Sequence, residues 1–324
     1  MSSFTVGTRG SALATTQTGH VADALASLSG LTPQTILVKT EGDVTSGPLA
    51  QLGGTGVFAA ALRVALLKGR CDLAVHSLKD LPTAQPEALV LAAMPERVDV
   101  RDALCARDGL TLASLPAGAT IGTGSPRRAA QLKYARPDVD IVDIRGNVGT
   151  RLGRVKGSPE QADDGGVGRV AQRDLDAVVL AAAGLRRLGL QEHVTEYLDP
   201  SVMLPAPGQG TLAVECRPET VADPGSPLAA ALAALDDDAT RLAVTSERGL
   251  LARLEAGCAA PIGALASVDG ELLTLDAVVC AQDGSDVIRR SASTRDLTDD
   301  GARALGVQLA ELLLREGAAD LAGL

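Results

Sequence analysis

The sequence has very few aromatic residues and no tryptophan. Aromatic residues make up 1% of its 324 residues, namely Phe4, Phe58, Tyr134 and Tyr197. Leucine, valine and alanine must therefore fill the cores, and platforms on which nucleic-acid bases could stack are hardly available. The formal net charge of -10 further opposes binding to a phosphate backbone. We therefore exclude nucleic acid as a partner and expect any anionic ligand to be small and to meet a local cluster of arginine and lysine.

Long apolar runs, paired cysteines and clustered histidines are also missing. No stretch reaches about 18 consecutive apolar residues, so we expect no membrane span. The five cysteines are widely spaced and the three histidines are far apart, so we predict neither a disulfide framework nor a metal site. The N-terminus lacks the basic and apolar regions of a signal peptide. These features favour a cytoplasmic protein with reduced thiols.

From residue 4 to about residue 217, short β-branched runs alternate with stretches rich in alanine and leucine. This alternation is typical of βαβ units and predicts an α/β fold with a largely parallel sheet. Residues 6–14 and 121–129 resemble each other, because each is a strand, a Gly-Thr turn and a serine that opens a helix. We infer two similarly built lobes that face a shared cleft.

After residues 223–227 the pattern changes to that of a third domain. A long helical stretch is predicted over 228–255, antiparallel strands over 272–279 and 287–293, and an amphipathic helix over 302–315. We therefore expect a small α+β domain at the C-terminus, and a long mobile loop at 157–173. The predicted domain limits are 1–103 with 211–228 for the first lobe, 104–210 for the second lobe, and 229–324 for the third domain.

The motif Ser125-Pro126-Arg127-Arg128 predicts a helix N-terminus that carries two arginines in its first turn. Cations there oppose the helix dipole, whereas a bound carboxylate or phosphate would account for them. The alternative is a pair of arginines that are solvated or ion-paired at the surface. We expect that removing either cation does not harm the helix.

Further arginines follow other predicted strands. Arg9 precedes the helix-capping Ser11, and Arg145 and Arg151 come just after a strand. Ligands of open α/β sheets bind beyond the carboxyl ends of the strands, where all these arginines fall. Because guanidinium groups bind planar carboxylates in a bidentate manner, the implied ligand carries several carboxylates.

Two other residues are candidates for chemistry. Asp80 follows a strand and precedes Pro82, so it either faces the same cleft or simply caps a turn. Cys258 lies between Gly257, which can end a helix, and Pro261, so its thiol is expected in a loop. Most isolated cysteines are inert small hydrophobic residues, and the sequence pattern alone leaves that alternative open.

Seven segments of the chain, taken together, resemble the porphobilinogen deaminase family, whose members are also called hydroxymethylbilane synthases. They occur in the family's order across nearly the whole chain. The segments are Gly7-Thr8-Arg9-Gly10-Ser11-Ala12-Leu13-Ala14-Thr15-Thr16-Gln17, Lys39-Thr40-Glu41-Gly42-Asp43, His76-Ser77-Leu78-Lys79-Asp80-Leu81-Pro82, Gly124-Ser125-Pro126-Arg127-Arg128, Arg145-Gly146-Asn147-Val148-Gly149-Thr150-Arg151-Leu152, Leu204-Pro205-Ala206-Pro207-Gly208-Gln209-Gly210 and Gly257-Cys258-Ala259-Ala260-Pro261-Ile262-Gly263.

The resemblance implies two lobes like those of type II periplasmic binding proteins and a small C-terminal domain. It implies that Cys258 carries one dipyrromethane cofactor through a thioether, since a soft thiolate can trap the electrophile formed when porphobilinogen loses ammonia. Asp80 would be the catalytic carboxylate, which stabilises the developing positive charge. The product would be hydroxymethylbilane, built from four porphobilinogen molecules by a monomeric enzyme of haem biosynthesis.

The resemblance also implies which residues hold the acetate and propionate side chains. The expected cofactor-binding residues besides the cysteine are Ser77, Lys79, Thr123, Ser125, Arg127, Arg128, Arg145 and Gly146. The expected substrate-binding residues are Arg9, Ser11, Gln17, Arg151, Arg187 and Gln209.

The sequence departs from the family at two places, and one alternative function stays open. Gly124 stands where the family often has a serine, and the loop at 157–173 is longer than usual. The alternative is a non-catalytic carboxylate-binding protein with two lobes, because the fold alone does not choose between the two. Asp80 and Cys258 favour the enzyme, since a simple binder does not need them.

Overall fold

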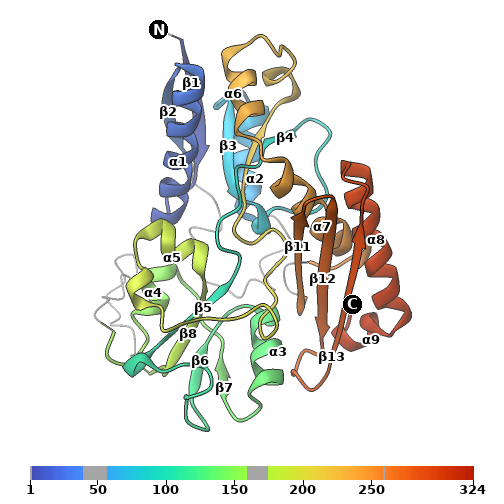
Figure 1. Cartoon of the computed structure of the whole chain (residues 1–324). Coiled ribbons are helices and arrows are strands. Elements are labelled where there is room, and N and C mark those ends of the chain that lie inside the picture. The colour runs from blue at the N-terminus through green and yellow to red at the C-terminus, as the bar shows by residue number, and fades with distance from the viewer. Residues whose placement is uncertain (1, 39–56, 159–173, 258–259) are drawn as a thin grey trace.

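The computed structural model describes residues 2–38, 57–158, 174–257 and 260–324. Its strands form three sheets, two with five strands and one with three. Figure 1 shows the first two sheets one above the other and the third at their side. The predicted loop at 157–173 lies almost entirely outside the described residues, as does Cys258.

The first lobe is built around a sheet with the strand order β2-β1-β3-β10-β4. Phe4, Leu25 and Leu73 are fully buried between this sheet and helix α1. Its elements are β1 (Ser3–Thr8), α1 (Ala12–Ser29), β2 (Thr32–Leu37), α2 (Val57–Leu67), β3 (Leu73–Ser77), the 3-10 helix η3 (Leu78–Asp80), β4 (Val90–Ala93), β10 (Leu212–Cys216), the 3-10 helix η6 (Pro218–Thr220) and α6 (Pro227–Leu235).

The second lobe has the strand order β7-β6-β8-β5-β9. Leu104, Ile121 and Leu132 fill its core on one side of the sheet. Its elements are β5 (Asp102–Ala106), the 3-10 helix η4 (Arg107–Gly109), β6 (Thr120–Gly122), α3 (Pro126–Ala135), β7 (Asp140–Val142), α4 (Val148–Leu152), β8 (Ala177–Ala181), α5 (Ala182–Leu188), the 3-10 helix η5 (Gln191–His193) and β9 (Glu196–Tyr197).

Both large sheets are mixed. In each, four of the five strands run in one direction, as expected for a largely parallel sheet, and one strand is reversed. In the first sheet β10 runs antiparallel to both β3 and β4. In the second sheet β5 runs antiparallel to both β8 and β9. The chain crosses between the lobes twice, once between β4 and β5 and once between β9 and β10. Strands β5 and β10 directly follow these two crossing segments, so the chain enters both strands from the opposite end of the sheet.

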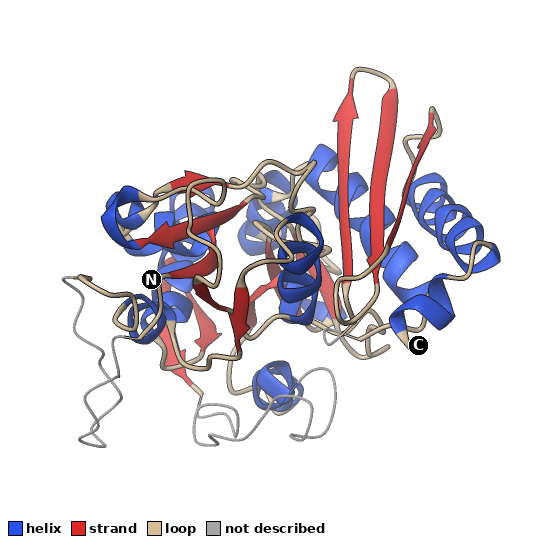
Figure 2. Ribbon diagram, turned by 90° about the horizontal axis from the view of Figure 1, so that it is seen from below, coloured by secondary structure: helices blue, strands red, loops and turns tan. Residues whose placement is uncertain are grey.

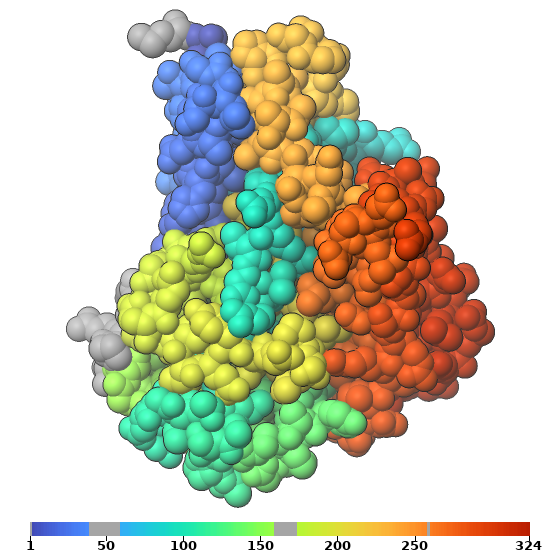
Figure 3. All heavy atoms as spheres, in the orientation of Figure 1, coloured from blue at the N-terminus to red at the C-terminus, as the bar shows by residue number. Residues whose placement is uncertain are grey.

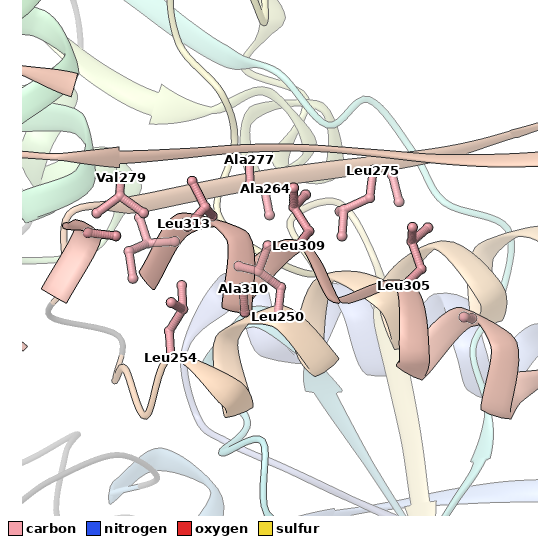
Figure 4. Packing of buried hydrophobic residues seen from close by; sticks show 14 of the residues in the cluster. Leu250, Leu254, Ala264, Leu275, Ala277, Val279, Leu305, Leu309, Ala310 and Leu313 are labelled. Carbon is pink, nitrogen blue, oxygen red and sulfur yellow. The ribbon is translucent and has the colours of Figure 1, made fainter. Parts of the chain in front are cut away.

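The third domain packs helices against one side of a three-stranded antiparallel sheet, as Figure 2 shows. Leu250 and Leu254 of α7 meet Leu305, Leu309 and Leu313 of α8 under this sheet (Figure 4). The elements are α7 (Asp238–Arg253), β11 (Ile262–Asp269), β12 (Leu272–Cys280), β13 (Val287–Thr294), α8 (Asp299–Arg315) and α9 (Ala318–Ala322). The α/β, α/β and α+β organisation expected from the sequence is therefore confirmed.

The helical stretch predicted over 228–255 is two helices, because two aspartates interrupt it. Asp236 has extended backbone angles and accepts a hydrogen bond from Met94 N at 2.7 Å. Asp237 caps α7 by accepting from Thr240 N at 2.7 Å. Short acidic side chains favour caps over helix interiors, which explains the break.

The end of α7 also differs from the expectation that Gly257 terminates it. The helix ends at Arg253, and Glu255 adopts the left-handed conformation with φ 53. Ala256 N then donates to Leu251 O at 3.2 Å, as in a Schellman motif. A glutamate therefore takes the position that glycine usually occupies at a helix C-terminus.

The predicted domain limits stay a prediction, and we propose to move two of them. The limit at 103/104 falls inside β5, whose pairing partners all belong to the second sheet. The limit at 228/229 falls inside α6, which packs on the core of the first lobe through Ala231 and Leu232. We propose limits near residues 101 and 236 instead.

The lobes and the third domain meet around the two crossing segments. The segment near residue 100, in teal, lies in the middle of the face seen in Figure 3, between the two lobes and the orange third domain. Helix α1 also packs against α5 across the lobes, where Leu13 lies close to Gly184. In the described part of the chain no helix is long and apolar enough to cross a membrane.

Candidate active site

Asp80 lies at the rim of a pocket because strand β3 runs directly into the short helix η3. Leu78 is fully buried and anchors this turn, and Leu81 N donates to Leu78 O at 3.0 Å. The side chain of Asp80 is consequently left exposed at the end of the turn. This carboxylate is therefore available to a ligand rather than used in capping.

The pocket beside Asp80 gathers five of the predicted residues of the first lobe. Its polar lining consists of Arg9, Ser11, Gln17, His76, Ser77 and Asp80. Ser11 caps helix α1 by accepting from Ala14 N at 3.3 Å. Gln17 Nε2 donates to Ser77 Oγ at 3.2 Å, which holds both side chains against the pocket wall. The pocket thus combines a guanidinium, hydroxyl groups and a carboxylate.

Arg127 and Arg128 begin helix α3, as predicted, but they are not at the surface. Their exposed fractions are 4% and 6%, and both pair with the fully buried Asp102. Arg127 Nη2 lies 2.8 Å from Asp102 Oδ2, and Arg128 Nη2 lies 2.7 Å from Oδ1. This burial argues against the expectation that removing either cation does not harm the helix, because a buried carboxylate would lose one of its two counter-charges.

The capping residues of α3 are in their expected places. Ser125 Oγ accepts from Arg128 N at 3.5 Å, and Ser125 N donates to the buried Thr123 Oγ1 at 3.2 Å.

The glycine at position 124, which departs from the family pattern, has a physical reason. A Cβ at this position would lie 2.5 Å from the carbonyl oxygen of Ile144, so a serine does not fit this backbone.

Lys79 faces the same cluster of charges from the first lobe. Its ammonium donates to Gln209 Oε1 at 3.2 Å. Burial and the positive charge of Arg128 lower the pKa of Lys79 to about 8, against the opposing effect of Asp80 and Asp102. Lys79 therefore lies near the arginines of the second lobe, and the site spans both lobes.

Gln209 is fully buried, and its amide is fully used by the protein. Its oxygen accepts from Lys79, and its nitrogen donates to Val100 O and to Asp102 Oδ1, both at 2.9 Å. The two hydrogens and the oxygen thus all have protein partners in this conformation. Gln209 connects Lys79 with Asp102 here, and its predicted contact with substrate stays untested.

Arg145, Gly146 and Arg151 form the other side of the cluster. Burial and the nearby Arg128 and Arg145 lower the pKa of Arg151 to about 10, and Asp80 also acts on this arginine. Arg151 Nε donates to Gly146 O at 2.9 Å. Gly146 has φ 110, and a Cβ there would lie 2.8 Å from Thr150, so glycine is required.

Arg187 lies in α5, near the second crossing segment. Its Nη2 donates to Gly210 O at 2.8 Å, and burial lowers its pKa to about 10. Arg127 and Arg128 of α3 and Arg151 of α4 thus lie on the side of the second lobe that faces Lys79 and Asp80, whereas Arg187 contacts the second crossing segment.

The four described cysteines are buried and free. Burial raises the pKa of Cys105 to about 12 and those of Cys216 and Cys280 to about 11, and it also raises the pKa of Cys71. Their thiols are therefore poor nucleophiles at neutral pH. Cys258 lies outside the described residues, but the chain beside it is anchored, because Ala264 N donates to Pro205 O at 2.9 Å.

Sequence reasoning missed three buried acidic residues that organise the cations. Asp102, Glu215 and Glu247 each have an exposed fraction of 0%. Nothing in their sequence surroundings distinguishes them from the exposed aspartates and glutamates that make up most of the acidic residues. Their role depends on partners 20 to 150 residues away, as in the pair Arg97–Glu247.

Comparison with known proteins assigns the chain to a family. The model of "Porphobilinogen deaminase, dipyromethane cofactor binding domain" matches residues 4–222, and that of "Porphobilinogen deaminase, C-terminal domain" matches residues 241–315. The chain belongs to the porphobilinogen deaminase family. Porphobilinogen deaminase of Micrococcus luteus is 56% identical and covers 100% of this chain and 95% of its own length. That of Cutibacterium acnes is also 56% identical, with 100% and 98% covered.

Another relative is porphobilinogen deaminase 1 of Streptomyces coelicolor, which is 52% identical over 98% of this chain and 97% of its own length. The predicted family is thus confirmed, as are the enzyme class and a domain that binds dipyrromethane. A non-catalytic carboxylate-binding protein is not favoured by these matches.

Solved structures of binding proteins are also similar to this chain. A periplasmic substrate-binding protein of an ABC transporter from Coxiella burnetii is 15% identical, with a TM-score of 0.43 over 72% of this chain and 91% of that chain. The methionine-binding protein MetQ is 13% identical, with a TM-score of 0.40 over 71% and 89%.

Proposed function

We propose that this chain condenses four porphobilinogen molecules on a dipyrromethane primer, with release of four ammonia molecules, and that one water then cleaves the bond to the primer and releases the tetrapyrrole as hydroxymethylbilane. The observation that carries this proposal is the position of Asp80, an exposed carboxylate at the rim of a pocket that also contains Arg9 and Ser11. Lys79 and Arg151 lie within electrostatic range of this carboxylate, one from each lobe. A site with one exposed carboxylate among several cations fits a cationic reaction on polycarboxylate rings.

Asp80 is assigned the catalytic role. Its carboxylate would accept hydrogen bonds from pyrrole N–H groups and stabilise the positive charge that develops as ammonia leaves and the next ring attacks. Each condensation forms one carbon–carbon bond and releases one ammonia. A neutral side chain at this position would not provide this stabilisation.

The cations of the second lobe are assigned to the acetate and propionate side chains of the primer and the growing chain. The donor set fits this ligand, because Arg127 Nε and Arg145 Nε are buried and make no hydrogen bond among the described residues. Two guanidinium donors thus remain for oxygen acceptors that the protein does not supply. When bound, dipyrromethane supplies the nucleophilic pyrrole carbon on which the chain grows.

Cys258 is assigned as the attachment residue. The support from the described part of the chain is indirect, since the other four cysteines are buried and have raised pKa values. Arg9, Ser11, Gln17 and Arg187 are proposed to bind the incoming porphobilinogen. We further propose that the enzyme works as a cytoplasmic monomer.

Intact-protein mass spectrometry tests the central claim. We expect the purified protein, or the protein incubated with porphobilinogen, to carry the mass of one dipyrromethane, which peptide mapping places on Cys258. Cys258→Ala is the control and should fold but stay unmodified. A folded wild-type protein that remains unmodified in the presence of porphobilinogen would contradict the proposal and support a binding protein.

A further inference from the structure

Asp102 lies at the centre of the cation cluster, yet it does not face the ligand. It is the first residue of β5 and has an exposed fraction of 0%. Its two carboxylate oxygens form ion pairs with Arg127 and Arg128, and one of them accepts a hydrogen bond from Gln209. Although burial raises the pKa of this carboxyl, the two guanidinium groups outweigh burial, and the pKa lies well below its usual range. Asp102 is thus a permanent buried anion.

The arginines that Asp102 holds are fixed at further points. Arg127 Nη1 donates to Leu204 O at 2.7 Å, and Arg128 Nη1 donates to Val179 O at 3.0 Å. Each guanidinium is therefore locked by a carboxylate on one side and a backbone carbonyl on another. Such fixed forks bind carboxylates with little loss of side-chain entropy.

The same carboxylate reaches the first lobe through Gln209. Asp102 Oδ1 accepts from Gln209 Nε2 at 2.9 Å, and Gln209 Oε1 accepts from Lys79 Nζ at 3.2 Å. Lys79 is the immediate neighbour of Asp80 and lies in the other lobe. An unbroken chain of polar contacts therefore runs from the second lobe to the residue beside the proposed catalytic carboxylate.

We propose that Asp102 is a positioning residue: one buried carboxylate holds two arginines of the second lobe directly and a lysine of the first lobe through Gln209. This inference rests on the proposed function, because it assigns these three cations to the binding of carboxylated pyrroles. Asp102 itself does not touch the ligand. Its effect is on the geometry and charge of the groups that do.

A change at Asp102 should be detectable at Lys79. Among the described residues, the charged groups that act on Lys79 include Asp80 in η3, Asp102 in β5, and Arg127 and Arg128 in α3. Without the negative charge of Asp102, the positive charges of the two arginines are less compensated near Lys79, so the protonated form of Lys79 becomes less favourable. The pKa of Lys79 should then fall below its present value of about 8.

The experiment measures this through the reactivity of the lysine amines. Wild-type protein and Asp102→Asn are labelled with an amine-reactive anhydride across a pH series, and peptide mass spectrometry follows each of the five lysines (Lys39, Lys68, Lys79, Lys133 and Lys156). We expect the labelling curve of Lys79 to move to lower pH in the variant, while that of the distant Lys68 stays unchanged. Incorporation of dipyrromethane from porphobilinogen should slow by about 100-fold, because misplaced binding groups lose most of their effect.

Two further variants separate positioning from plain stability. Asp176→Asn removes another buried carboxylate of the second lobe, which pairs with Arg107 and Lys156 instead. It should lower the melting temperature without moving the Lys79 curve or slowing incorporation. Gln209→Met is close in shape and breaks the contact with Lys79 while it keeps both arginine pairs, so it should move the Lys79 curve even if Asp102→Asn fails to fold.

The outcomes also separate this inference from the proposed function. Unchanged Lys79 curves in both Asp102→Asn and Gln209→Met would overturn the inference, even if the wild-type protein carries the cofactor. A wild-type protein that never takes up dipyrromethane would overturn the proposed function, whereas the shift at Lys79 would still establish the contact chain through Gln209.

Discussion

Arg97 and Glu247 form a buried bidentate ion pair, with Nη1 to Oε1 at 2.6 Å and Nη2 to Oε2 at 3.1 Å. Arg97 belongs to the first crossing segment, and Glu247 belongs to α7 of the third domain. Glu247 also accepts from Gly208 N at 2.6 Å and from Ala266 N at 2.8 Å. One carboxylate thus joins both crossing segments to the third domain.

Glu247→Gln should therefore be strongly destabilising. The substitution leaves the guanidinium of Arg97 buried without a counter-charge and weakens the acceptors for two backbone amides, so we expect a loss of about 3 kcal/mol in the free energy of unfolding. Urea titration followed by circular dichroism measures it. The control is Arg295→Gln, which breaks an exposed pair with Glu271 and should change stability by less than about 0.5 kcal/mol. Equal losses of unfolding free energy in the two variants would contradict the conclusion that Glu247 joins the crossing segments to the third domain.

Asp80→Asn tests the catalytic carboxylate. Because the side chain is exposed, we expect stability to change by less than about 0.5 kcal/mol. Turnover should fall by at least about 100-fold, since the amide cannot stabilise a developing positive charge in the same way. Steady-state release of ammonia measures the rate. Near-native turnover would remove Asp80 from this role.

Glu215 should make stability depend on pH. Burial raises the pKa of this carboxyl, but hydrogen bonds from His76 and Arg63 lower it to about 2. Because the folded pKa lies below the unfolded value of about 4.3, the stabilisation is present above that pH and is lost as the pH falls toward 2. Glu215→Gln should be less stable at pH 7, and its deficit should shrink by about 3 kcal/mol by pH 2. A deficit that does not change over this range in urea titrations would rule out the linkage.

Two glycines should respond to alanine in opposite directions. A Cβ at Gly306 would lie 2.1 Å from Ser246 O and 2.6 Å from Leu250 N, where α8 crosses α7. We expect Gly306→Ala to lower the free energy of unfolding by about 3 kcal/mol, because the backbone of α7 must move. Gly19 lies within α1 with open space around it, so Gly19→Ala should raise stability by about 0.5 to 1 kcal/mol. Differential scanning calorimetry of both variants shows whether the two changes in stability have opposite signs.

Arg128→Leu distinguishes the structure from the sequence-based expectation. The sequence predicts no harm to the helix, whereas the structure shows Arg128 Nε and Nη2 both donating to Asp102 Oδ1, at 3.0 and 2.7 Å. We expect a loss of about 3 kcal/mol in the free energy of unfolding, because Asp102 keeps only one cation. Thermal melts compare the stability of Arg128→Leu with that of Arg145→Leu. The ion pair of Arg145 with Asp143 is longer, at 3.4 Å. A milder effect at Arg128 than at Arg145 would support the sequence-based view.

The sequence was sufficient for features that depend on local chemistry. Ser125 and Pro126 predict the start of α3 correctly, since capping and the fixed φ of proline act on neighbouring residues. Strand β6 and helix α3 form where residues 121–129 predict a strand, a Gly-Thr turn and a helix opened by a serine, and the lobes and the third domain occur in the predicted order. Asp80 and Arg9 could be placed in one pocket because both follow strands of the same sheet.

Features that depend on distant partners could not be predicted in this way. The sequence left two alternatives for Arg127 and Arg128, a bound anion or a surface position. Asp102, which lies more than 20 residues earlier, gave no local signal of the buried ion pairs. The antiparallel direction of β10 depends on where the chain returns from the second lobe. Likewise, the helix end at Glu255 reflects packing of α7 rather than residue preference, which favours glycine.

Strand β10 occupies an inner position of the first sheet, between β3 and β4, although it follows the whole second lobe in the chain. All strands of the second sheet lie between residues 102 and 197. On the ribosome, the second lobe can therefore complete its sheet while the first still lacks residues 212–216. Until those residues emerge, the nascent chain exposes two unpaired strand edges, so the lobe whose synthesis begins first completes its sheet after the second lobe.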